Sequence, residues 1–458
     1  MKMDTVIFRE YDIRGVYNEQ FDLGFAKKLG QAYVAFLAKE AGKRDLTVTI
    51  GHDARLSSPD ITNALAEGMM ESGAVVKLIG MVTTPMSYFT TFAIPGVDGA
   101  IMVTGSHNPP EYNGFKISVG KGTIFGEKIQ QLREIIQRGD FIRGEGRKET
   151  IDIFPAYLAK HKEEFGQLKP IKVVLDCGNG AGGVIARKLF NAVGIDPEIL
   201  FEEPDGRFPN HHPDPTVEKN LKDLVKRVKE TGAVAGIGFD GDADRIGLVD
   251  HTGKMIYGDE LICLIAKQVL KVLPGKKIIG DVKCSDRMFT YIKTYGGEPI
   301  MWKTGHSLIK EKIKVEKSPF GGEMSGHIFF SDRNYGYDDA VYAGLRVVEL
   351  LSETGKTIPE LLADLPPAFN TPEIRIDTTE EKKHLIVERL KQEFAKPGAD
   401  FQTNLIDGIR VSFKDGWALA RASNTQPVLV LRFEASTQAG LDRIRDRFEA
   451  IVNPLLES

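Results

Sequence analysis

Cysteine is scarce in this chain of 458 residues. Its three cysteines, Cys177, Cys263 and Cys284, are widely separated, and no two of them form a C-x-x-C pair. This spacing excludes a disulfide-based framework and gives no support to a zinc site. The sequence therefore predicts a protein of a reducing compartment.

Long apolar runs and blocks of like charge are also missing. The longest apolar stretches, such as Leu261 to Ala266, are far shorter than the roughly 20 residues that span a bilayer. The net charge of -4 is spread along the chain, which argues against nucleic acid and membranes as partners. Asp4, Arg9 and Glu10 lie where a signal peptide needs a continuous apolar stretch, so we expect a cytoplasmic protein.

Hydrophobic residues make up 42% of the chain, whose length exceeds what one hydrophobic core usually serves. Three segments repeat one pattern: an apolar strand, a loop with Asp and small residues, an amphipathic helix, a glycine and a second strand. The repeats begin about 105 to 125 residues apart. Their predicted elements cover 46–53, 64–71 and 74–79, then 171–176, 184–193 and the stretch to 200, then 277–281, 287–295 and 299–302. The pattern predicts three tandem mixed α/β domains.

The region after Pro366 has a different order of predicted helices and strands. A helix over 382–394, strands over 408–413, 417–422 and 428–433, and a closing helix over 441–456 indicate an α+β domain. Pro366, Pro367 and Pro372 favour an extended connector, which we expect to act as a hinge. The predicted domains are 1–150, 151–253, 254–367 and 368–458.

Ser106 follows a short apolar strand, in the segment Thr104 to Pro110. Gly105 permits a tight turn, the following prolines stop a helix from starting, and the serine is left on a turn beside His107. A serine in this position can act as a nucleophile or carry a phosphate. An isolated Ser-His pair is more often an ordinary turn, so the other loops must decide.

Asp240, Asp242 and Asp244 alternate with small residues after another apolar strand. Such carboxylates can turn toward one centre and supply the oxygen ligands that a divalent cation prefers. The segment does not fit an EF-hand, since its sixth position would be Arg245 rather than Gly and its twelfth His251 rather than Glu. A metal site is favoured over a solvated acidic turn, because an apolar strand leads in and Arg245 balances part of the charge.

A third polar loop contains Glu323, Ser325 and His327 among three glycines. A carboxylate, a hydroxyl and an imidazole on a flexible loop suit the hydroxyl groups of a sugar. This loop is weak evidence by itself, since glycine-rich polar turns often only connect elements.

A fourth polar loop, Arg421 to Pro427, joins two predicted strands of the tail. The guanidinium of Arg421, the hydroxyls of Ser423 and Thr425, the amide of Asn424 and the backbone N–H groups would make a good phosphate cradle. As an isolated hairpin loop, the segment would be equally consistent with a simple connection.

The segment Gly178 to Gly183 matches the G-x-G-x-x-G string of dinucleotide-binding sites. Acidic residues follow so densely that the ribose-binding acid of such a site cannot be singled out. We therefore do not expect a nicotinamide cofactor.

Together the four loops offer a phosphorylatable serine, a cation site, sugar-binding groups and a remote phosphate clamp, as phosphoryl transfer on a phosphosugar requires. The set resembles the α-D-phosphohexomutase superfamily, in particular its bacterial phosphomannomutase/phosphoglucomutase branch. The resemblance extends from Phe8 to Gly15 through Lys283 and Gly305 to Ser307 as far as Arg421, which is essentially the whole chain. It implies three mixed α/β domains and a fourth, TATA-box-binding-protein-like α+β domain around a central cleft.

The resemblance also implies roles for individual residues. Ser106 would carry the phosphate, which would complete the coordination of a Mg²⁺ held by Asp240, Asp242 and Asp244. The groups around the transferring phosphoryl would be Tyr11, Arg14, His107, Asn113 to Lys116 and Arg245. Glu323 and Ser325 would read the sugar O3 and O4, with Lys283 and His306 nearby, and Arg421, Ser423, Asn424 and Thr425 would hold the other phosphate.

The group that moves the proton of the attacking hydroxyl is less clearly marked. Lys116 and His327 are the candidates, because an amine beside other cations loses its proton more readily and an imidazole titrates near neutral pH.

The function implied by the resemblance is that of an isomerase that moves phosphate reversibly between C1 and C6 of mannose and glucose phosphates. Hexose 1,6-bisphosphate would be the intermediate and activator. Phosphoglucosamine mutase, whose sugar loop usually has Gln at the position of Met324, is the nearest alternative. A Mg²⁺-dependent phosphosugar phosphatase and a phosphosugar-binding protein without turnover are alternatives from other classes. The oligomeric state is open, with a monomer favoured.

Overall fold

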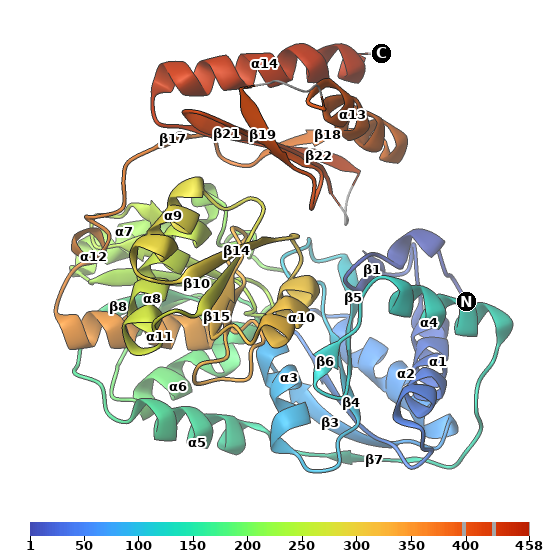
Figure 1. Ribbon diagram of the computed structural model, residues 1–458. Coiled ribbons are helices and arrows are strands. Elements are labelled where there is room, and N and C mark those ends of the chain that lie inside the picture. The colour runs from blue at the N-terminus through green and yellow to red at the C-terminus, as the bar shows by residue number, and fades with distance from the viewer. Residues whose placement is uncertain (396–399, 424–426, 458) are drawn as a thin grey trace.

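The computed structural model describes residues 1–395, 400–423 and 427–457, which form four β-sheets in chain order. Three of the sheets mix parallel and antiparallel strands, and the fourth is antiparallel. The predicted fold class, three mixed α/β units and a C-terminal α+β unit, is confirmed (Figure 1). None of the helices in these residues combines the length and apolar character needed to cross a membrane.

The first sheet has the order β1-β5-β4-β2-β3-β7, with β6 beside β5. Its strands are β1 Ile13–Val16, β2 Thr47–His52, β3 Val75–Met81, β4 Gly99–Val103, β5 Tyr112–Val119, β6 Gly122–Thr123 and β7 Arg147–Thr150. The helices of this region are η1 Thr5–Ile7, α1 Leu23–Ala41, α2 Ser58–Glu71, α3 Thr84–Ala93 and α4 Glu127–Arg138.

The second sheet has the order β12-β11-β10-β8-β9. Its strands are β8 Val173–Asp176, β9 Glu198–Leu200, β10 Ala235–Phe239, β11 Ile246–Asp250 and β12 Met255–Ile256. The helices are α5 Phe154–Phe165, η2 Ala181–Val184, α6 Ala186–Ala192, η3 Glu218–Leu221 and α7 Lys222–Thr231. The single helix predicted over 184–193 is thus divided into a 3-10 turn and a shorter α-helix.

The third sheet has the order β14-β13-β15-β16. Its strands are β13 Lys277–Asp281, β14 Glu298–Trp302, β15 Phe320–Gly322 and β16 Ile328–Phe330. The helices are α8 Gly258–Val272, α9 Asp286–Thr294, α10 His306–Glu316, α11 Ala340–Thr354 and α12 Ile358–Leu361. Helix α11 follows the third sheet in the chain but packs on the second, where Gly344 lies against Ile237 and Phe190. The second and third units therefore share one hydrophobic core.

The tail sheet has the order β17-β22-β21-β20-β19, with β18 beside β22. Its strands are β17 Phe369–Asn370, β18 Ile374–Asp377, β19 Phe401–Asn404, β20 Ile409–Phe413, β21 Gly416–Ala422 and β22 Val428–Ala435. Helices α13 Glu380–Glu393 and α14 Gln438–Glu457 cover the face of this sheet that points away from the rest of the chain (Figure 1).

The opposite face of the tail sheet is docked on the segment that follows β13. Trp417 and Val282 are fully buried in one small apolar cluster. The guanidinium of Arg410 lies 3.6 Å from the centre of the Trp417 ring and donates to the carbonyl of Cys284 at 2.8 Å. Arg432 donates to the carbonyl of Lys283. Buried guanidinium groups thus bind the tail to the backbone beside the predicted sugar-binding region.

All four predicted functional loops occupy the same kind of position in the fold. Each loop joins two neighbouring antiparallel strands: β4 to β5, β10 to β11, β15 to β16 and β21 to β22. In the first three sheets the strand before the loop is also paired in parallel with a neighbour. Ligands commonly bind where strand direction changes at the carboxyl ends of such strands. The fold therefore directs all four loops toward one region.

Candidate active site

A cleft of about 650 Å³ lies between the four units. The predicted site residues that line it are Tyr11, Arg14, Ser106, His107, Lys116, Arg245, Lys283, His306, Glu323, Ser325, His327, Arg421 and Ser423. The three aspartates lie behind this wall and are fully buried. Asn424 and Thr425 lie outside the described residues.

Arg55 holds the serine loop in place from beneath. Its guanidinium donates to the backbone carbonyls of Ser106, Asn108, Pro109 and Tyr112, which together surround it. The carbonyl of Pro109 also accepts from the backbone N–H of Tyr112 at 3.0 Å. The shape of the loop is therefore set by a buried cation together with the loop's own hydrogen bonds.

Gly105 is required by the packing of this loop. A Cβ atom on it would lie 2.5 Å from the Arg55 guanidinium and 2.9 Å from the carbonyl of Tyr112. The next residue, Ser106, has a φ of 49°, in the left-handed region that a residue with a side chain seldom adopts. The backbone strain is thus located at the proposed nucleophile, as is common at functional sites.

The hydroxyl of Ser106 meets the acidic loop directly. Its Oγ donates to Oδ2 of Asp240 at 2.8 Å and lies 3.1 Å from Nδ1 of His107. The two loops touch through their backbones as well, since a Cβ on Gly241 would lie 2.4 Å from the carbonyl oxygen of Ser106. A phosphate on Ser106 would therefore lie within reach of the carboxylates.

The three aspartates converge on one centre. One carboxylate oxygen from each lies within 4.8 Å of the others. Burial and the charges of Asp242 and Asp244 raise the pKa of Asp240 well above its usual range. Oδ1 of Asp242 and Oδ1 of Asp244 are buried without a hydrogen-bond partner among the described residues. Unpaired buried oxygens beside a third carboxylate fit a divalent cation, which prefers oxygen ligands.

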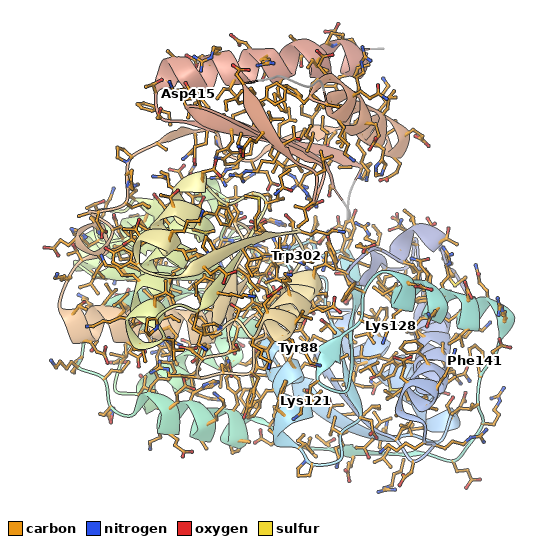
Figure 2. All side chains as sticks on the ribbon, viewed as in Figure 1. Tyr88, Lys121, Lys128, Phe141, Trp302 and Asp415 are labelled. Atoms are coloured by element: carbon orange, nitrogen blue, oxygen red, sulfur yellow. The ribbon has the colours of Figure 1, made fainter. Side chains whose placement is uncertain are left out.

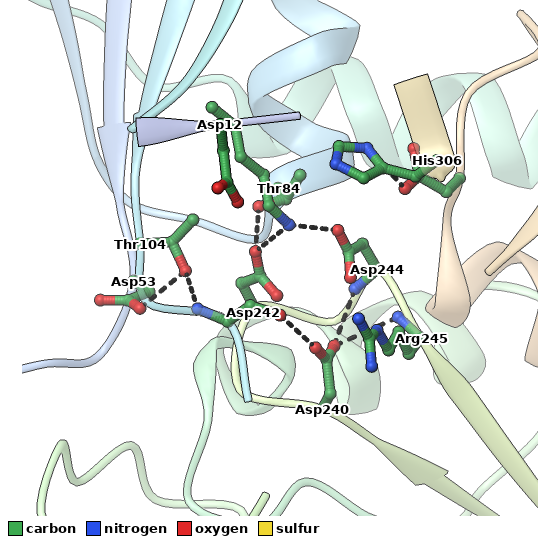
Figure 3. Close-up of polar contacts among 12 residues, drawn as sticks. Asp12, Asp53, Thr84, Thr104, Asp240, Asp242, Asp244, Arg245 and His306 are labelled. Atoms are coloured by element: carbon green, nitrogen blue, oxygen red, sulfur yellow. Dashed lines mark hydrogen bonds and ion pairs between the residues drawn. The ribbon is translucent and has the colours of Figure 1, made fainter. Parts of the chain in front are cut away.

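Lys116, on β5, lies on the other side of these carboxylates. Its Nζ donates to Oδ2 of Asp242 at 2.7 Å and to Asp244 (Figure 3). Burial lowers the pKa of Lys116, but the two carboxylates outweigh it and raise the pKa above the ordinary value. The expectation that neighbouring cations would lower this pKa is therefore wrong, because carboxylates and not cations are nearest to the amine.

The remaining groups near the serine are cationic or hydrogen-bonding. Arg14 donates to the side chain of Asn108 at 2.8 Å and pairs with Asp12. His107 is kept neutral, because burial and the charges of Arg245 and Arg14 lower its pKa well below the usual range. Tyr11 donates to the backbone carbonyl of Thr304 at 2.6 Å. This side of the cleft is suited to an anion.

The third predicted loop, residues 321–327 (the sugar loop), presents a buried carboxylate. Oε1 of Glu323 accepts from the backbone N–H of Gly305, and burial raises the pKa of this carboxyl. Ser325 is half-buried on the same loop. Lys283 faces them after β13, and its amine is 3.1 Å from Oε2 of Glu373. Glu373 reaches the cleft from the tail and was not among the predicted site residues.

His306 and His327 stack face to face, with ring centres 5.3 Å apart. His327 comes from the sugar loop, and its backbone pairs with that of Arg245 in an isolated antiparallel bridge. The acidic loop, which ends at Arg245, and the loop 321–327 are thus joined directly, between the second and third sheets.

The tail closes the far end of the cleft. Nε of Arg421 donates to Oδ2 of Asp407 at 3.1 Å, and the backbone of Ser423 is bonded to Val428 at 2.9 Å. Lys383 donates to the carbonyl of Ser423 at 2.6 Å. The tail therefore supplies a fixed guanidinium to the cleft on the side of Lys283.

Five groups near this site were not predicted from the sequence: Asp53, Arg55, Lys310, Asp338 and Glu373. No local motif marks them; the Asp53 carboxylate, for example, accepts from Oγ1 of Thr104, 51 residues later in the chain. The string Gly51-His52-Asp53 at the end of a predicted strand was the available signal for the first, since charged residues at strand ends are often functional.

The glycine-rich segment that matches a dinucleotide site has a structural task here. The N–H of Ala181 donates to the carbonyl of Gly241 at 2.9 Å, and a Cβ on Gly180 would lie 2.8 Å from that same carbonyl. The segment therefore supports the acidic loop by close backbone packing.

Comparison with families of known proteins matches four successive parts of the chain. Residues 5–143, 155–253 and 257–369 match phosphoglucomutase/phosphomannomutase alpha/beta/alpha domains I, II and III, and 373–451 match the C-terminal domain. The matches appear in chain order and cover almost the full length.

Individual relatives are similar over nearly their whole length. A phosphomannomutase/phosphoglucomutase of Pseudomonas aeruginosa is 46% identical over 442 residues, which are 96% of this chain and 94% of the relative. A phosphoglucomutase of Neisseria gonorrhoeae is 44% identical and covers 98% of both chains. A crystal structure of a phosphoglucomutase/phosphomannomutase family protein from Burkholderia thailandensis has a TM-score of 0.91 and 42% identity, over 99% of this chain and 98% of that one.

Proposed function

Since the chain belongs to the phosphoglucomutase/phosphomannomutase family, we propose that it moves a phosphoryl group reversibly between C1 and C6 of mannose and glucose phosphates, with Ser106 as the carrier. The observation that carries this proposal is the 2.8 Å contact between the Ser106 hydroxyl and Asp240, inside a cleft that Arg421 enters from the far side. A carrier and a distant phosphate-binding group suit a substrate that holds phosphate at either end.

The acidic loop would hold Mg²⁺ through Asp240, Asp242 and Asp244, together with the phosphate on Ser106. Such an ion supplies positive charge that neutralises the phosphoryl oxygens during transfer. Arg14, beside Asn108, would add a planar cation at the same point.

Lys116 would place a positive charge beside the metal ligands in this scheme, since its amine donates to Asp242 and Asp244. His327 is then the better candidate for accepting the proton of the attacking sugar hydroxyl. The nitrogen for this task would be Nε2, which would have to exchange its hydrogen bond from Arg245 for one from the sugar hydroxyl.

The sugar would be held by Glu323 and Ser325 at O3 and O4, with Lys283 and His306 beside them. The second phosphate would lie at Arg421, Ser423, Asn424 and Thr425. After the first transfer, a hexose 1,6-bisphosphate would turn end over end and return its other phosphate to Ser106. Groups that read O3 and O4 but not O2 would tolerate both mannose and glucose.

Changing Ser106 to Ala tests this assignment. We expect turnover to fall at least about 10³-fold, because the phosphate carrier is lost, while binding of glucose 1-phosphate changes little. The control is Ser72→Ala, since the Ser72 hydroxyl is buried far from the cleft without a partner among the described residues. Near-normal turnover in Ser106→Ala would refute the assignment.

The alternatives differ in what they release and accept. Mannose, glucose and glucosamine 1-phosphates assayed in parallel separate a phosphoglucosamine mutase from the proposed enzyme. Free phosphate measured in the same reactions identifies a phosphatase, since a mutase conserves phosphate. Intact mass before and after phosphatase treatment detects the phosphate on Ser106.

A further inference from the structure

The half-buried Lys310 and the buried Asp338 lie beside the stacked histidines. Lys310 lies one turn after His306 on α10, and Asp338 precedes α11. They pair with each other at 3.0 Å, Nζ to Oδ1, and Asp338 is fully buried. The amine of Lys310 also lies 4.1 Å from the ring centre of Tyr88, where α3 approaches α10 (Figure 2). The pair is therefore held in place on two sides.

The proton position on His327 follows from its partners. Nε of Arg245 donates to Nε2 of His327 at 3.0 Å. An arginine side chain keeps all its protons in proteins and has no acceptor, so Nε2 must carry the lone pair. The ring proton is then on Nδ1, which lies 2.9 Å from Oδ2 of Asp338. This is a contact at ion-pair distance, since neither Nδ1 nor Oδ2 forms a hydrogen bond of good geometry among the described residues. Nδ1 also lies 3.6 Å from Oδ1 of Asp244.

The proton position on His306 is the opposite. Nζ of Lys310 lies 3.2 Å from Nδ1 of His306. An ammonium group only donates, so Nδ1 carries the lone pair and the ring proton is on Nε2. Burial and the charge of Lys310 lower the pKa of His306 well below its usual range, which keeps the ring neutral.

We infer that Arg245 and the Lys310–Asp338 pair together set opposite tautomers on the two histidines, so that His327 has an acceptor at Nε2 and His306 a donor at Nε2–H. Lys310 and Asp338 are positioning residues, since they act only through the rings. Resting on the proposed function, Nε2 of His327 can take the proton of the attacking hydroxyl once it gives up its hydrogen bond from Arg245, and Nε2–H of His306 can bind a sugar oxygen. Two chemically identical side chains thereby perform different tasks.

Nitrogen-15 NMR of histidine-labelled protein tests the tautomers without turnover. We expect the Nδ1–H pattern for His327 and the Nε2–H pattern for His306, each assigned by its His→Gln variant. In Asp338→Asn an amide that donates to Nδ1 would oppose the Arg245 donor at Nε2, so His327 should show a mixture of the two tautomers. Lys310→Met should mix the tautomers of His306. Asp250→Asn, another buried carboxylate, and Lys312→Met, on the same helix, should leave both patterns unchanged.

Steady-state kinetics distinguish a positioning role of Asp338 from a general contribution to the stability of the fold. In Asp338→Asn, kcat should fall by about 10²- to 10⁴-fold while KM changes less than about threefold, as when a histidine elsewhere loses its orienting carboxylate. A wild-type spectrum with His327 protonated on Nε2 would overturn the inference. So would Lys310→Met and Asp338→Asn variants that retain both tautomers. If the tautomers are as stated but the wild type has no mutase activity, the proposed function fails and this inference stands.

Discussion

Arg55 provides the sharpest test of how the serine loop is held. Its side chain is fully buried and donates to four backbone carbonyls of residues 106–112. Replacing it with Met keeps the length of the side chain but removes every donor. If two of the four carbonyls stay unpaired at about 2 kcal/mol each, the loop loses about 4 kcal/mol of local stability. That loss equals about a thousandfold rise in local opening.

Hydrogen exchange followed by mass spectrometry measures this opening in peptides that cover residues 104–114. The amides of Thr104, Asn108 and Tyr112 report it, since each is bonded within this segment. Turnover should fall in parallel, because Ser106 would no longer be held against Asp240. Arg138→Met, on an exposed helix end, is the control. Arg55→Met with wild-type exchange in this segment would refute the reasoning.

Three further predictions concern the carboxylates. Asp240→Asn should weaken Mg²⁺ binding at least about tenfold in calorimetric titrations. Chelation should stop the wild-type enzyme until Mg²⁺ is returned. Equal Mg²⁺ affinity in the wild type and the variant would contradict the metal assignment. Burial raises the pKa of Asp339 to about 6, so the folded state binds this proton more tightly and stability falls as pH rises from about 4 to 6. Asp339→Asn should flatten that decline by up to about 3 kcal/mol in urea unfolding, and an unchanged slope would exclude this carboxyl as its source. Glu323→Gln should raise KM for glucose 1-phosphate about tenfold, the equivalent of one hydrogen bond to a charged group, and an unaltered KM would remove Glu323 from the sugar site.

The fold class could be read from the sequence because many of the strands and helices carry their own periodicity. The predicted helix over 441–456 is α14 Gln438–Glu457, and the strand over 277–281 is β13 Lys277–Asp281. Strand β5 was not predicted, although Tyr112–Val119 contains Lys116. It is buried along most of its length, so the alternation that marks a half-exposed strand is absent.

The site could be predicted as far as its local motifs reach. The four loops were identified because each puts several functional groups within a few residues of a strand end. The direction of the Lys116 pKa could not be obtained, since it depends on Asp242 and Asp244, more than a hundred residues away in sequence. Asp338 is close to His327 in sequence, but no motif shows that the chain turns back between them, as the bridge between Phe329 and Asp338 does.

The segment 282–284 connects the two ends of the cleft mechanically. Its carbonyls receive the guanidinium groups of Arg410 and Arg432, while the amine of Lys283 points among the sugar-binding groups. A swing of the tail about the proline connector would have to pull on this segment or break those buried contacts. A tail movement that keeps these contacts would therefore shift Lys283 within the cleft.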